Sequence, residues 1–63
     1  MQNEFLKILL VDDEPDILEL VGYHLKKEGY QVFTAVNGVE AVKLANKITP
    51  NLILLDIMMP EMD

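Results

Sequence analysis

Three short aliphatic segments alternate with two amphipathic segments along the chain, and this alternation leaves few folds open. Residues 8–11, 30–36 and 51–57 are rich in β-branched, aliphatic or aromatic residues, which is typical of strands. Residues 15–27 and 37–48 instead carry apolar residues at helical spacing. Because strand–helix–strand units with short connections form parallel sheets with right-handed crossovers, the sequence predicts an α/β fold, with a parallel three-stranded β-α-β-α-β arrangement.

Local signals place the ends of both predicted helices. Pro15 suits the first turn of the first helix, and Gly29 supplies its stop. Asn37, with Glu40 three residues later, is a capping pair for the second helix, and Thr49 followed by proline ends it. The apolar faces are predicted to consist of Ile17, Leu18, Val21 and Leu25 in the first helix and of Ala41, Leu44, Ala45 and Ile48 in the second.

Acidic residues follow the first and the third predicted strands. Asp12 and Asp13 come directly after residues 8–11, and Asp56 stands where the third strand would otherwise carry another buried aliphatic residue. In a parallel sheet, the carboxyl ends of all strands lie at one edge, which is where such folds bind ligands. If the first and third strands are neighbours, the three carboxylates converge there.

Such a convergence favours a hard divalent cation. Clustered carboxylates repel one another, and none of the five lysines belongs to the segments that follow the two strands. Mg²⁺ is typically held by one or two carboxylates plus waters and leaves room for a phosphate oxygen, whereas Ca²⁺ usually has a dedicated loop that is missing here. The turn after the first strand also lacks the glycines of a nucleotide-binding module.

Composition excludes several classes of function. A net charge of −6, with five lysines and no arginine, disfavours contact of this segment with nucleic acid or with an anionic membrane. With no cysteine and one histidine, the usual zinc cages are excluded. Residues 1–7 resemble neither a signal peptide nor a membrane span, so we expect a cytoplasmic protein. Solvated or dipole-complementing roles are the simpler expectation for Asp16, Glu19, Glu61, Asp63 and His24.

The motifs "ILLVDDEPD" and "PNLILLDIMMPEMD", with "NG" followed by "EA" between them, resemble the first half of the receiver domain of bacterial two-component response regulators. The resemblance covers the chain from Lys7 onward. It implies a doubly wound, flavodoxin-like fold with strand order 2-1-3 in this part. Residues 1–63 would then be the N-terminal half of one receiver domain, truncated before strand four.

The resemblance also implies roles for the acidic residues. Asp56 would be the phosphoacceptor, taking a phosphoryl group from a phosphohistidine of a sensor histidine kinase. Asp13, Asp56 and the backbone carbonyl of Met58 would ligate Mg²⁺, and Asp12 would act largely through a coordinated water. A carboxylate nucleophile needs no deprotonation at neutral pH. The chain would be a signalling domain rather than an enzyme, and the commonest parent of such a domain is a DNA-binding transcriptional regulator.

The chain also departs from the family pattern. In the family, a serine or threonine after strand four and a lysine after strand five contact the phosphoryl group, and a chain that stops at Asp63 lacks both. Neither Thr34 nor Thr49 is placed to substitute for the missing hydroxyl. Because such cations stabilise the transition state by several kcal/mol, we expect phosphotransfer by these 63 residues to be impaired.

Two alternatives stay open. The first is a self-associating structural fragment without signalling activity, because the third strand would be a bare apolar edge that pairs with a second copy or with the missing half of the domain. In that case the chain would not persist as a folded monomer. The second is a phosphatase with an aspartate nucleophile, although Met58 stands where such enzymes commonly carry a second acid.

Overall fold

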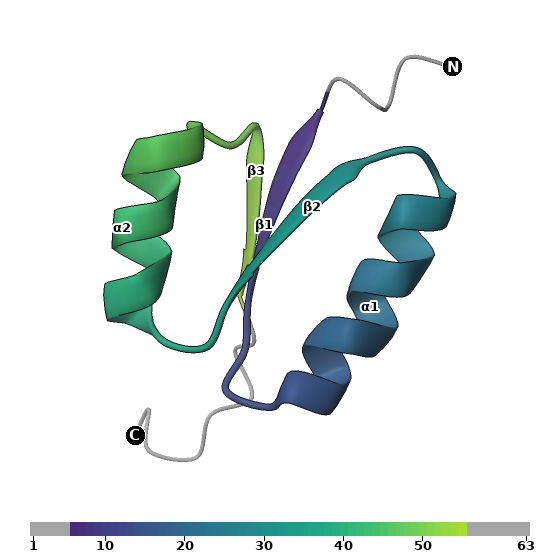
Figure 1. Cartoon of the computed structure of the whole chain (residues 1–63), viewed down its shortest axis with the longest axis horizontal. Helices are drawn as coiled ribbons and strands as arrows, with labels where there is room; N and C mark the ends of the chain where they lie inside the picture. Colours follow the sequence, from purple (N-terminus) through teal and green to yellow (C-terminus); the bar gives the residue numbers. More distant parts are fainter. Residues whose placement is uncertain (1–5, 56–63) are drawn as a thin grey trace.

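The computed structural model describes residues 6–55, in which strands and helices alternate as expected (Figure 1). The chain forms β1 (Lys7–Val11), α1 (Pro15–Lys27), β2 (Gln31–Ala35), α2 (Gly38–Ile48) and β3 (Leu52–Leu55). The predicted boundaries of these elements agree with the structure to within about two residues. The predicted continuation of the third strand to Ile57 lies outside the described residues.

The three strands form one parallel sheet in the order β2-β1-β3. Lys7 to Val11 pair in register with Gln31 to Ala35 on one side, and Ile8 to Val11 pair with Leu52 to Leu55 on the other. The predicted order 2-1-3 is therefore confirmed. It makes β1 the central strand and brings the carboxyl ends of β1 and β3 side by side.

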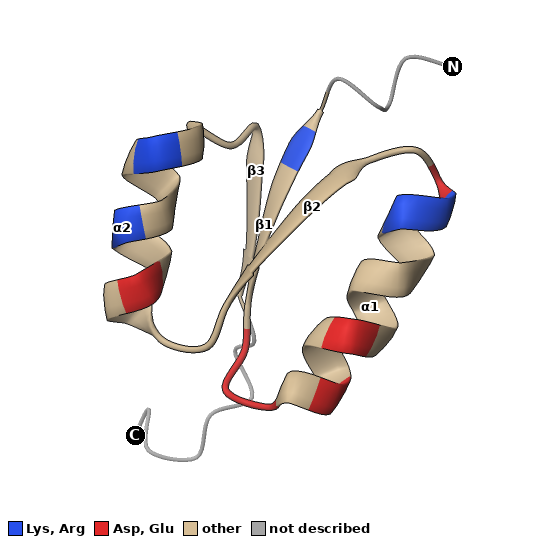
Figure 2. Cartoon of the chain, in the orientation of Figure 1, with Lys and Arg blue, Asp and Glu red and all other residues tan. Residues whose placement is uncertain are grey.

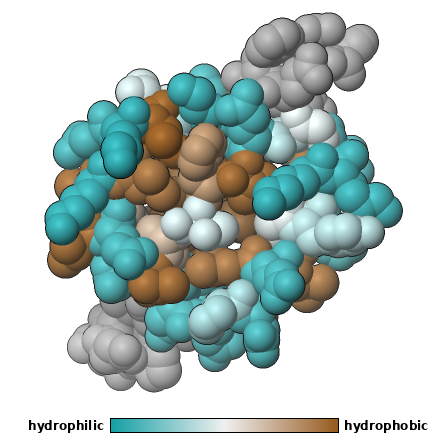
Figure 3. Space-filling view, viewed as in Figure 1, coloured by the Kyte–Doolittle hydropathy of each residue, from teal (hydrophilic) through white to brown (hydrophobic). Residues whose placement is uncertain are grey.

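The helices cover opposite faces of the sheet, so that β1 is buried from both sides (Figure 1). Ile8, Leu9, Leu10 and Val11 are each at most 8% exposed. On the α2 face, Leu9, Val11 and Ala35 form a cluster against which Phe33, Ala41, Leu44 and Ala45 pack. On the face viewed in Figure 3, apolar side chains gather between the two helices. The apolar face predicted for the second helix is thus confirmed by three of its residues.

The predicted apolar stripe of the first helix is partly wrong. The buried residues of α1 are Leu18 and Gly22, whereas Ile17 is 39% exposed. The reason is the placement of the helix, which packs mainly on β2. A Cβ atom added at Gly22 would meet Val32 at 3.6 Å, so a small residue lets α1 lie close to β2. The flank of the helix that carries Ile17 borders a hollow beside β3 instead of packed side chains.

The helix ends follow the predicted local signals. Pro15 occupies the first turn of α1, and Gly29, after its last turn, has a φ of 99°. At the start of α2, the Glu40 N–H donates to Asn37 Oδ1 (2.8 Å), and the Val36 N–H donates to Glu40 Oε1 (3.2 Å). Asn37 therefore caps α2 as predicted, while the Glu40 carboxylate accepts the N–H of the residue before the cap and not that of Asn37 as in a standard capping box. In the described part, no helix is long and apolar enough to cross a membrane.

At the amino end of the sheet, hydrogen bonds join three elements. The Lys7 N–H donates to Asn51 Oδ1, and the Asn51 N–H donates back to the Lys7 carbonyl oxygen, both at 2.8 Å. The Lys7 ammonium donates to the carbonyl oxygen of Ile48, the last residue of α2, at 3.0 Å. Lys7 therefore ties the start of β1 to the start of β3 and also caps the negative end of the α2 dipole.

Candidate functional site

Asp12 is held at the carboxyl edge of the sheet by strand pairing of the residue before it and by its own backbone hydrogen bond. Val11, the residue before it, pairs with Leu55 of β3. The Asp12 N–H donates to the Ala35 carbonyl oxygen (3.1 Å), which extends the ladder between β1 and β2 by one residue. Asp12 is 7% exposed, and among the residues that the structure describes it is the one charged residue that is buried. The edge is therefore built around a fixed, buried carboxylate.

The turn into α1 fixes the orientation of that carboxylate. Asp12 Oδ1 accepts a hydrogen bond from the Glu14 N–H at 2.9 Å. Glu14 is extended, with φ −108° and ψ 111°, which is the conformation that a following proline favours. Pro15 thus limits the backbone to a shape in which the Glu14 N–H can reach Asp12. One carboxylate oxygen of Asp12 is committed to the backbone, at the positive end of the α1 dipole.

The neighbouring acidic residues lie on the surface. Asp13, Glu14 and Asp16 are exposed. Asp13 and Glu14 belong to the acidic turn between β1 and α1 in Figure 2, and Asp16 belongs to the start of α1. The solvated role expected for Asp16, in the first turn of α1, agrees with this position. Asp13 follows Asp12 directly, so two predicted magnesium ligands are adjacent at the expected edge.

The remaining predicted ligands lie outside the described residues. Asp56 follows Leu55, the last residue of β3, and the backbone carbonyl assigned to the metal belongs to Met58. Within residues 6–55, no group of three or more histidine, aspartate or glutamate residues is arranged to hold a metal ion. Convergence of three carboxylates therefore stays a prediction that depends on Asp56.

A small hollow of about 170 Å³ borders Asp12 on the α1 side of the sheet. Apart from Asp12 its lining is aliphatic and comes from β1, α1 and β3: Leu10, Val11, Ile17, Leu18, Val21, Leu54 and Leu55. Charges next to such an apolar wall are screened less than charges in open water. This surrounding strengthens the attraction between the Asp12 carboxylate and any cation bound beside it.

The lysines occupy the other parts of the molecule (Figure 2). Lys7 begins β1, whereas Lys26, Lys27 and Lys47 lie in the last turns of the two helices. Lys43 lies in the middle of α2. The expectation that no lysine belongs to the carboxyl edge is confirmed, and none of the five contributes a side chain next to Asp12 in the hollow described above.

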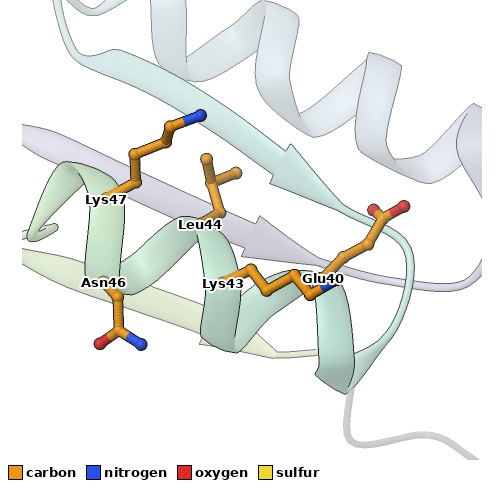
Figure 4. A pocket seen from close by; sticks show the side chains of 5 residues that line it. All are labelled: Glu40, Lys43, Leu44, Asn46 and Lys47. Atoms are coloured by element: carbon orange, nitrogen blue, oxygen red, sulfur yellow. The ribbon is translucent and has the colours of Figure 1, made fainter.

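A second hollow, of about 510 Å³, lies against α2 and is lined by Glu40, Lys43, Leu44, Asn46 and Lys47 (Figure 4). All of these residues belong to one helix, and the Glu40 carboxylate already accepts the Val36 N–H. The hollow therefore offers no converging set of reactive groups. The carboxyl edge remains the candidate site.

Sequence reasoning missed two features of the structure. The hydrogen bond between Asp12 and the Glu14 N–H has a local signal, since aspartate accepts N–H groups two residues ahead in turns. The bonds of Lys7 to Ile48 and Asn51 join residues more than 40 positions apart, and no periodicity in the sequence indicates such a pair.

Comparison with known proteins agrees with this geometry. The response regulator receiver domain family matches residues 8–63. The chain is 51% identical over 57 residues to the alkaline phosphatase synthesis transcriptional regulatory protein PhoP of Bacillus subtilis, covering 90% of this chain and 24% of that protein. It is 46% identical over all 63 residues to the probable transcriptional regulator ycf27 of Porphyra purpurea, covering 26% of that protein.

A solved structure shows the same arrangement of elements. The chemotaxis response regulator CheY4 of Vibrio cholerae superposes with a TM-score of 0.80 at 40% identity, covering 90% of this chain and 48% of that chain. The chain thus spans about a quarter of the curated relatives named above and about half of this structure. Since the family match takes in nearly every residue and the fold agrees, the chain belongs to the response regulator receiver domain family.

Proposed function

We propose that the chain is the phosphoaccepting part of a two-component signalling protein, with Asp56 as the phosphoacceptor. The observation that carries this proposal is the buried Asp12 carboxylate, held by the Glu14 N–H at the carboxyl edge where β1 and β3 lie side by side. A chain that needed only stability would gain from an aliphatic residue at such a position, because burying a carboxylate is costly. Membership of the receiver domain family offers a reason for burying Asp12, because a carboxylate at this edge can help to hold the proposed Mg²⁺.

The donor set at this edge fits Mg²⁺. Asp12 and Asp13 offer hard carboxylate oxygens, and the proposed set is completed by the Asp56 carboxylate and the Met58 carbonyl. Because one oxygen of Asp12 already accepts the Glu14 N–H, this residue is suited to act through a coordinated water. Bound Mg²⁺ would offset the negative charge of the incoming phosphoryl group.

The proposed reaction is a transfer between two side chains. A carboxylate oxygen of Asp56 attacks the phosphorus of a phosphohistidine, so that an O–P bond forms and the N–P bond breaks. The electron pair of the broken bond stays on the imidazole nitrogen, and the product is an acyl phosphate on Asp56. The partner that presents this phosphohistidine is a sensor histidine kinase, and we place the reaction in the cytoplasm.

We also propose that these 63 residues carry out the transfer slowly. The lysines lie at the amino end of the sheet or along the helices. Thr34 lies within β2, and Thr49 follows α2 at the opposite end of the sheet from Asp12. No side chain of the described part therefore offers a cation or a hydroxyl to a phosphoryl group at the carboxyl edge. The two relatives named above are transcriptional regulators, so a regulator of transcription is the proposed context.

The test is the intact mass of the chain before and after incubation with Mg²⁺ and acetyl phosphate. We expect a mass increase of one phosphoryl group that hydroxylamine removes, as it removes acyl phosphates, and that is absent without Mg²⁺. The variant Asp56→Asn should not be labelled. Asp16→Asn, an exposed acidic residue in the first turn of α1, is the matched control and should be labelled like the original chain.

A complete receiver domain treated in parallel serves as the positive control. Labelling of the Asp56→Asn variant to the same extent as the original chain would contradict the assignment of the phosphoacceptor. Labelling as fast as that of the complete receiver would contradict the proposed slow transfer. An unlabelled chain beside a labelled positive control would overturn the proposal for this polypeptide.

A further inference from the structure

β2 is the edge strand both in this chain and in the complete fold of the family. It stands at one end of the observed strand order β2-β1-β3. In the flavodoxin-like order 2-1-3-4-5, the later strands follow β3, and strand two keeps its place at the end. A contact through the outer edge of β2 therefore does not depend on where the chain stops, whereas the open edge of β3 does.

Alternate residues of β2 direct their backbone groups toward β1 and away from it. The Gln31 N–H donates to the carbonyl oxygen of the residue before β1 (2.9 Å), and the Ala35 carbonyl oxygen accepts the N–H of the residue after β1 (3.1 Å). Gln31 and Ala35 therefore face β1. Since neighbouring residues of a strand bond on opposite sides, the backbone groups of Val32 and Thr34 face outward.

The next outward N–H groups in both directions are already bonded. The Tyr30 N–H donates to the Leu25 carbonyl oxygen, and the Val36 N–H donates to the Glu40 carboxylate, both at 3.2 Å. In the part of the chain that the structure describes, the open stretch of this edge is therefore short, and its centre is Phe33.

The two helices that flank this edge carry the same pattern of side chains. Each has an acid, an aromatic or aliphatic residue four positions later and a lysine three positions after that: Glu19, Tyr23 and Lys26 on α1, and Glu40, Leu44 and Lys47 on α2. Residues at this spacing share one flank of a helix. The α1 set borders a hollow of about 540 Å³ together with β2. The α2 set lines the hollow of Figure 4, in which Leu44 and Lys47 extend toward β2.

We propose that β2 pairs with β2 of a second copy of this chain, antiparallel and about a two-fold axis at Phe33, so that the two sheets continue into one. This interface goes beyond the proposed phosphoacceptor function and does not depend on it. Val32 of each copy would exchange two backbone hydrogen bonds with Thr34 of the other. Figure 1 looks onto this edge, and on the same face in Figure 3 apolar side chains gather between the helices. Such an isologous contact closes after two copies.

The distribution of charge selects a second copy in this orientation. On both helices the acid lies toward the carboxyl end of the sheet and the lysine toward the amino end (Figure 2). Antiparallel pairing places Glu19 of each copy beside Lys26 of the other, and Glu40 beside Lys47. Parallel pairing would place like charges together, which disfavours association.

Both helices place the middle of the charged set close to the level of the proposed axis. A Cβ atom added at Gly22, between the acid and the lysine of α1, would meet Val32 at 3.6 Å. On α2, Glu40 is bonded to the residue after β2, and Lys7, which binds the last residue of α2, pairs with the first residue of β2. The middle of α2 therefore lies level with the middle of β2, which is Phe33. One two-fold axis thus satisfies the strand edge and both helices.

Mixed single-cysteine variants test the register, because the chain has no cysteine of its own. In the proposed dimer, Val32 lies opposite Thr34 of the second copy, about 5.5 Å away between Cα atoms, whereas two copies of either residue lie on a diagonal of about 7 to 8 Å. A disulfide is permitted only at the shorter separation. We therefore expect an equal mixture of the Val32→Cys and Thr34→Cys variants to cross-link at least about tenfold faster than either variant alone. The control mixes Thr34→Cys with Val42→Cys, which is 63% exposed and lies around α2 from Glu40, and it should cross-link only at the slow collisional rate.

Charge exchange tests the orientation by sedimentation equilibrium. We expect the original chain to pass from monomer to dimer as concentration rises. Glu19→Lys should raise the dimer dissociation constant at least about tenfold, although it makes the chain less negative, because it places two lysines together on each side of the axis. The double variant Glu19→Lys with Lys26→Glu restores opposite charges and should dimerise like the original chain. Val42→Lys is the control and should also dimerise normally, and circular dichroism reports whether each variant is folded.

The same variants are measured in a complete receiver domain that contains these residues, where further strands follow β3, and they should behave alike. A compact monomer at every concentration would refute the proposal. Cross-linking of either single variant as fast as the mixture would indicate another register or a parallel pair and would overturn the proposed axis. A dimer that Glu19→Lys leaves unchanged would place the contact elsewhere and would overturn the interface.

Discussion

The two ends of the sheet differ in how their polar groups are used. At the amino end, Lys7 exchanges backbone and side-chain hydrogen bonds with Asn51 and caps the last carbonyl of α2. At the carboxyl end, Asp12 is buried and accepts one N–H, and exposed carboxylates follow it in the chain. At the amino end, paired donors and acceptors therefore join β1, β3 and α2. The other end gathers like charges, which repel one another and which the proposed Mg²⁺ would offset.

Under the proposed function, the amino end of the sheet contributes to stability and the carboxyl end to metal binding. Substitutions at the amino end should lower the free energy of unfolding and leave the response to Mg²⁺ unchanged. Substitution of the exposed proposed ligand Asp13 at the other end should remove the response to Mg²⁺ and leave the metal-free stability nearly unchanged. Because association would also raise apparent stability, all comparisons belong at one protein concentration.

The largest effect is expected from Asp13→Ala at the carboxyl end. If Mg²⁺ binds the folded chain alone, a hundredfold excess over its dissociation constant raises the free energy of unfolding by about 2.7 kcal/mol. We expect the original chain to show this increase and the Asp13→Ala variant to lose it, with a metal-free stability within about 0.5 kcal/mol of the original because Asp13 is exposed. Urea unfolding followed by circular dichroism, with and without Mg²⁺, measures both quantities.

The matched control for this experiment is Asp16→Ala, another exposed carboxylate of the same region. It should keep the full increase with Mg²⁺. An unchanged increase in the Asp13→Ala variant would show that the metal, if it binds, does so elsewhere.

The next effect is expected from Lys7→Met at the amino end. This change removes the ammonium that donates to the Ile48 carbonyl and keeps the backbone bonds to Asn51. Hydrogen bonds from a charged donor contribute about 1.5 to 3 kcal/mol, and partial exposure reduces this, so we expect a loss of about 1 kcal/mol. Lys43→Met, on the exposed side of α2, should change the free energy of unfolding by less than half as much. A changed response to Mg²⁺ in the Lys7→Met variant would contradict the expectation that the amino end affects stability alone.

Most of this fold could be predicted from the sequence, because the signals for its strands and helix ends are local. The aliphatic run of β1, the proline that starts α1 and the Asn37 and Glu40 capping pair each act within a few residues, and all appear as expected. Placement of Asp12 at the carboxyl edge also follows from strand order, which came from the family resemblance. His24, whose ring lies edge-on to Tyr23, is exposed in the last turn of α1, as expected for it.

Features that depend on distant partners could not be predicted in this way. The contacts of Lys7 join it to residues 41 and 44 positions away. The rotation of α1 that buries Gly22 and exposes Ile17 depends on how closely the helix approaches β2. Helical periodicity gives the width of an apolar face, but neighbouring strands decide which part of it is covered.

A smaller change in the free energy of unfolding is expected at the starts of the two helices, which both lie at the carboxyl end of the sheet. Asn37 caps α2 through Glu40, whereas the Glu14 side chain makes no cap bond at the start of α1. Asn37→Ala should therefore lower the free energy of unfolding by about 1 kcal/mol. Glu14→Ala should change it by less than about 0.5 kcal/mol, because the N–H that Asp12 accepts remains. Equal losses in thermal unfolding of the two variants would contradict the assignment of the cap to Asn37.

The smallest effect is expected at Thr49, after the last turn of α2. Thr49 has a φ of 51°, in the left-handed region, and it is the one non-glycine residue of the described part with a positive φ. A β-branched residue there is strained by about 1 to 2 kcal/mol, whereas glycine adopts this conformation freely but loses more backbone entropy on folding. Thr49→Gly should therefore raise the free energy of unfolding by a few tenths of a kcal/mol to about 1 kcal/mol. Thr34→Gly, in the extended β2, should lower it, since glycine weakens a strand. A loss of stability in the Thr49→Gly variant would mean that the Thr49 side chain contributes more than its backbone strain costs, and the amino end would then depend on side-chain packing as well as on its hydrogen bonds.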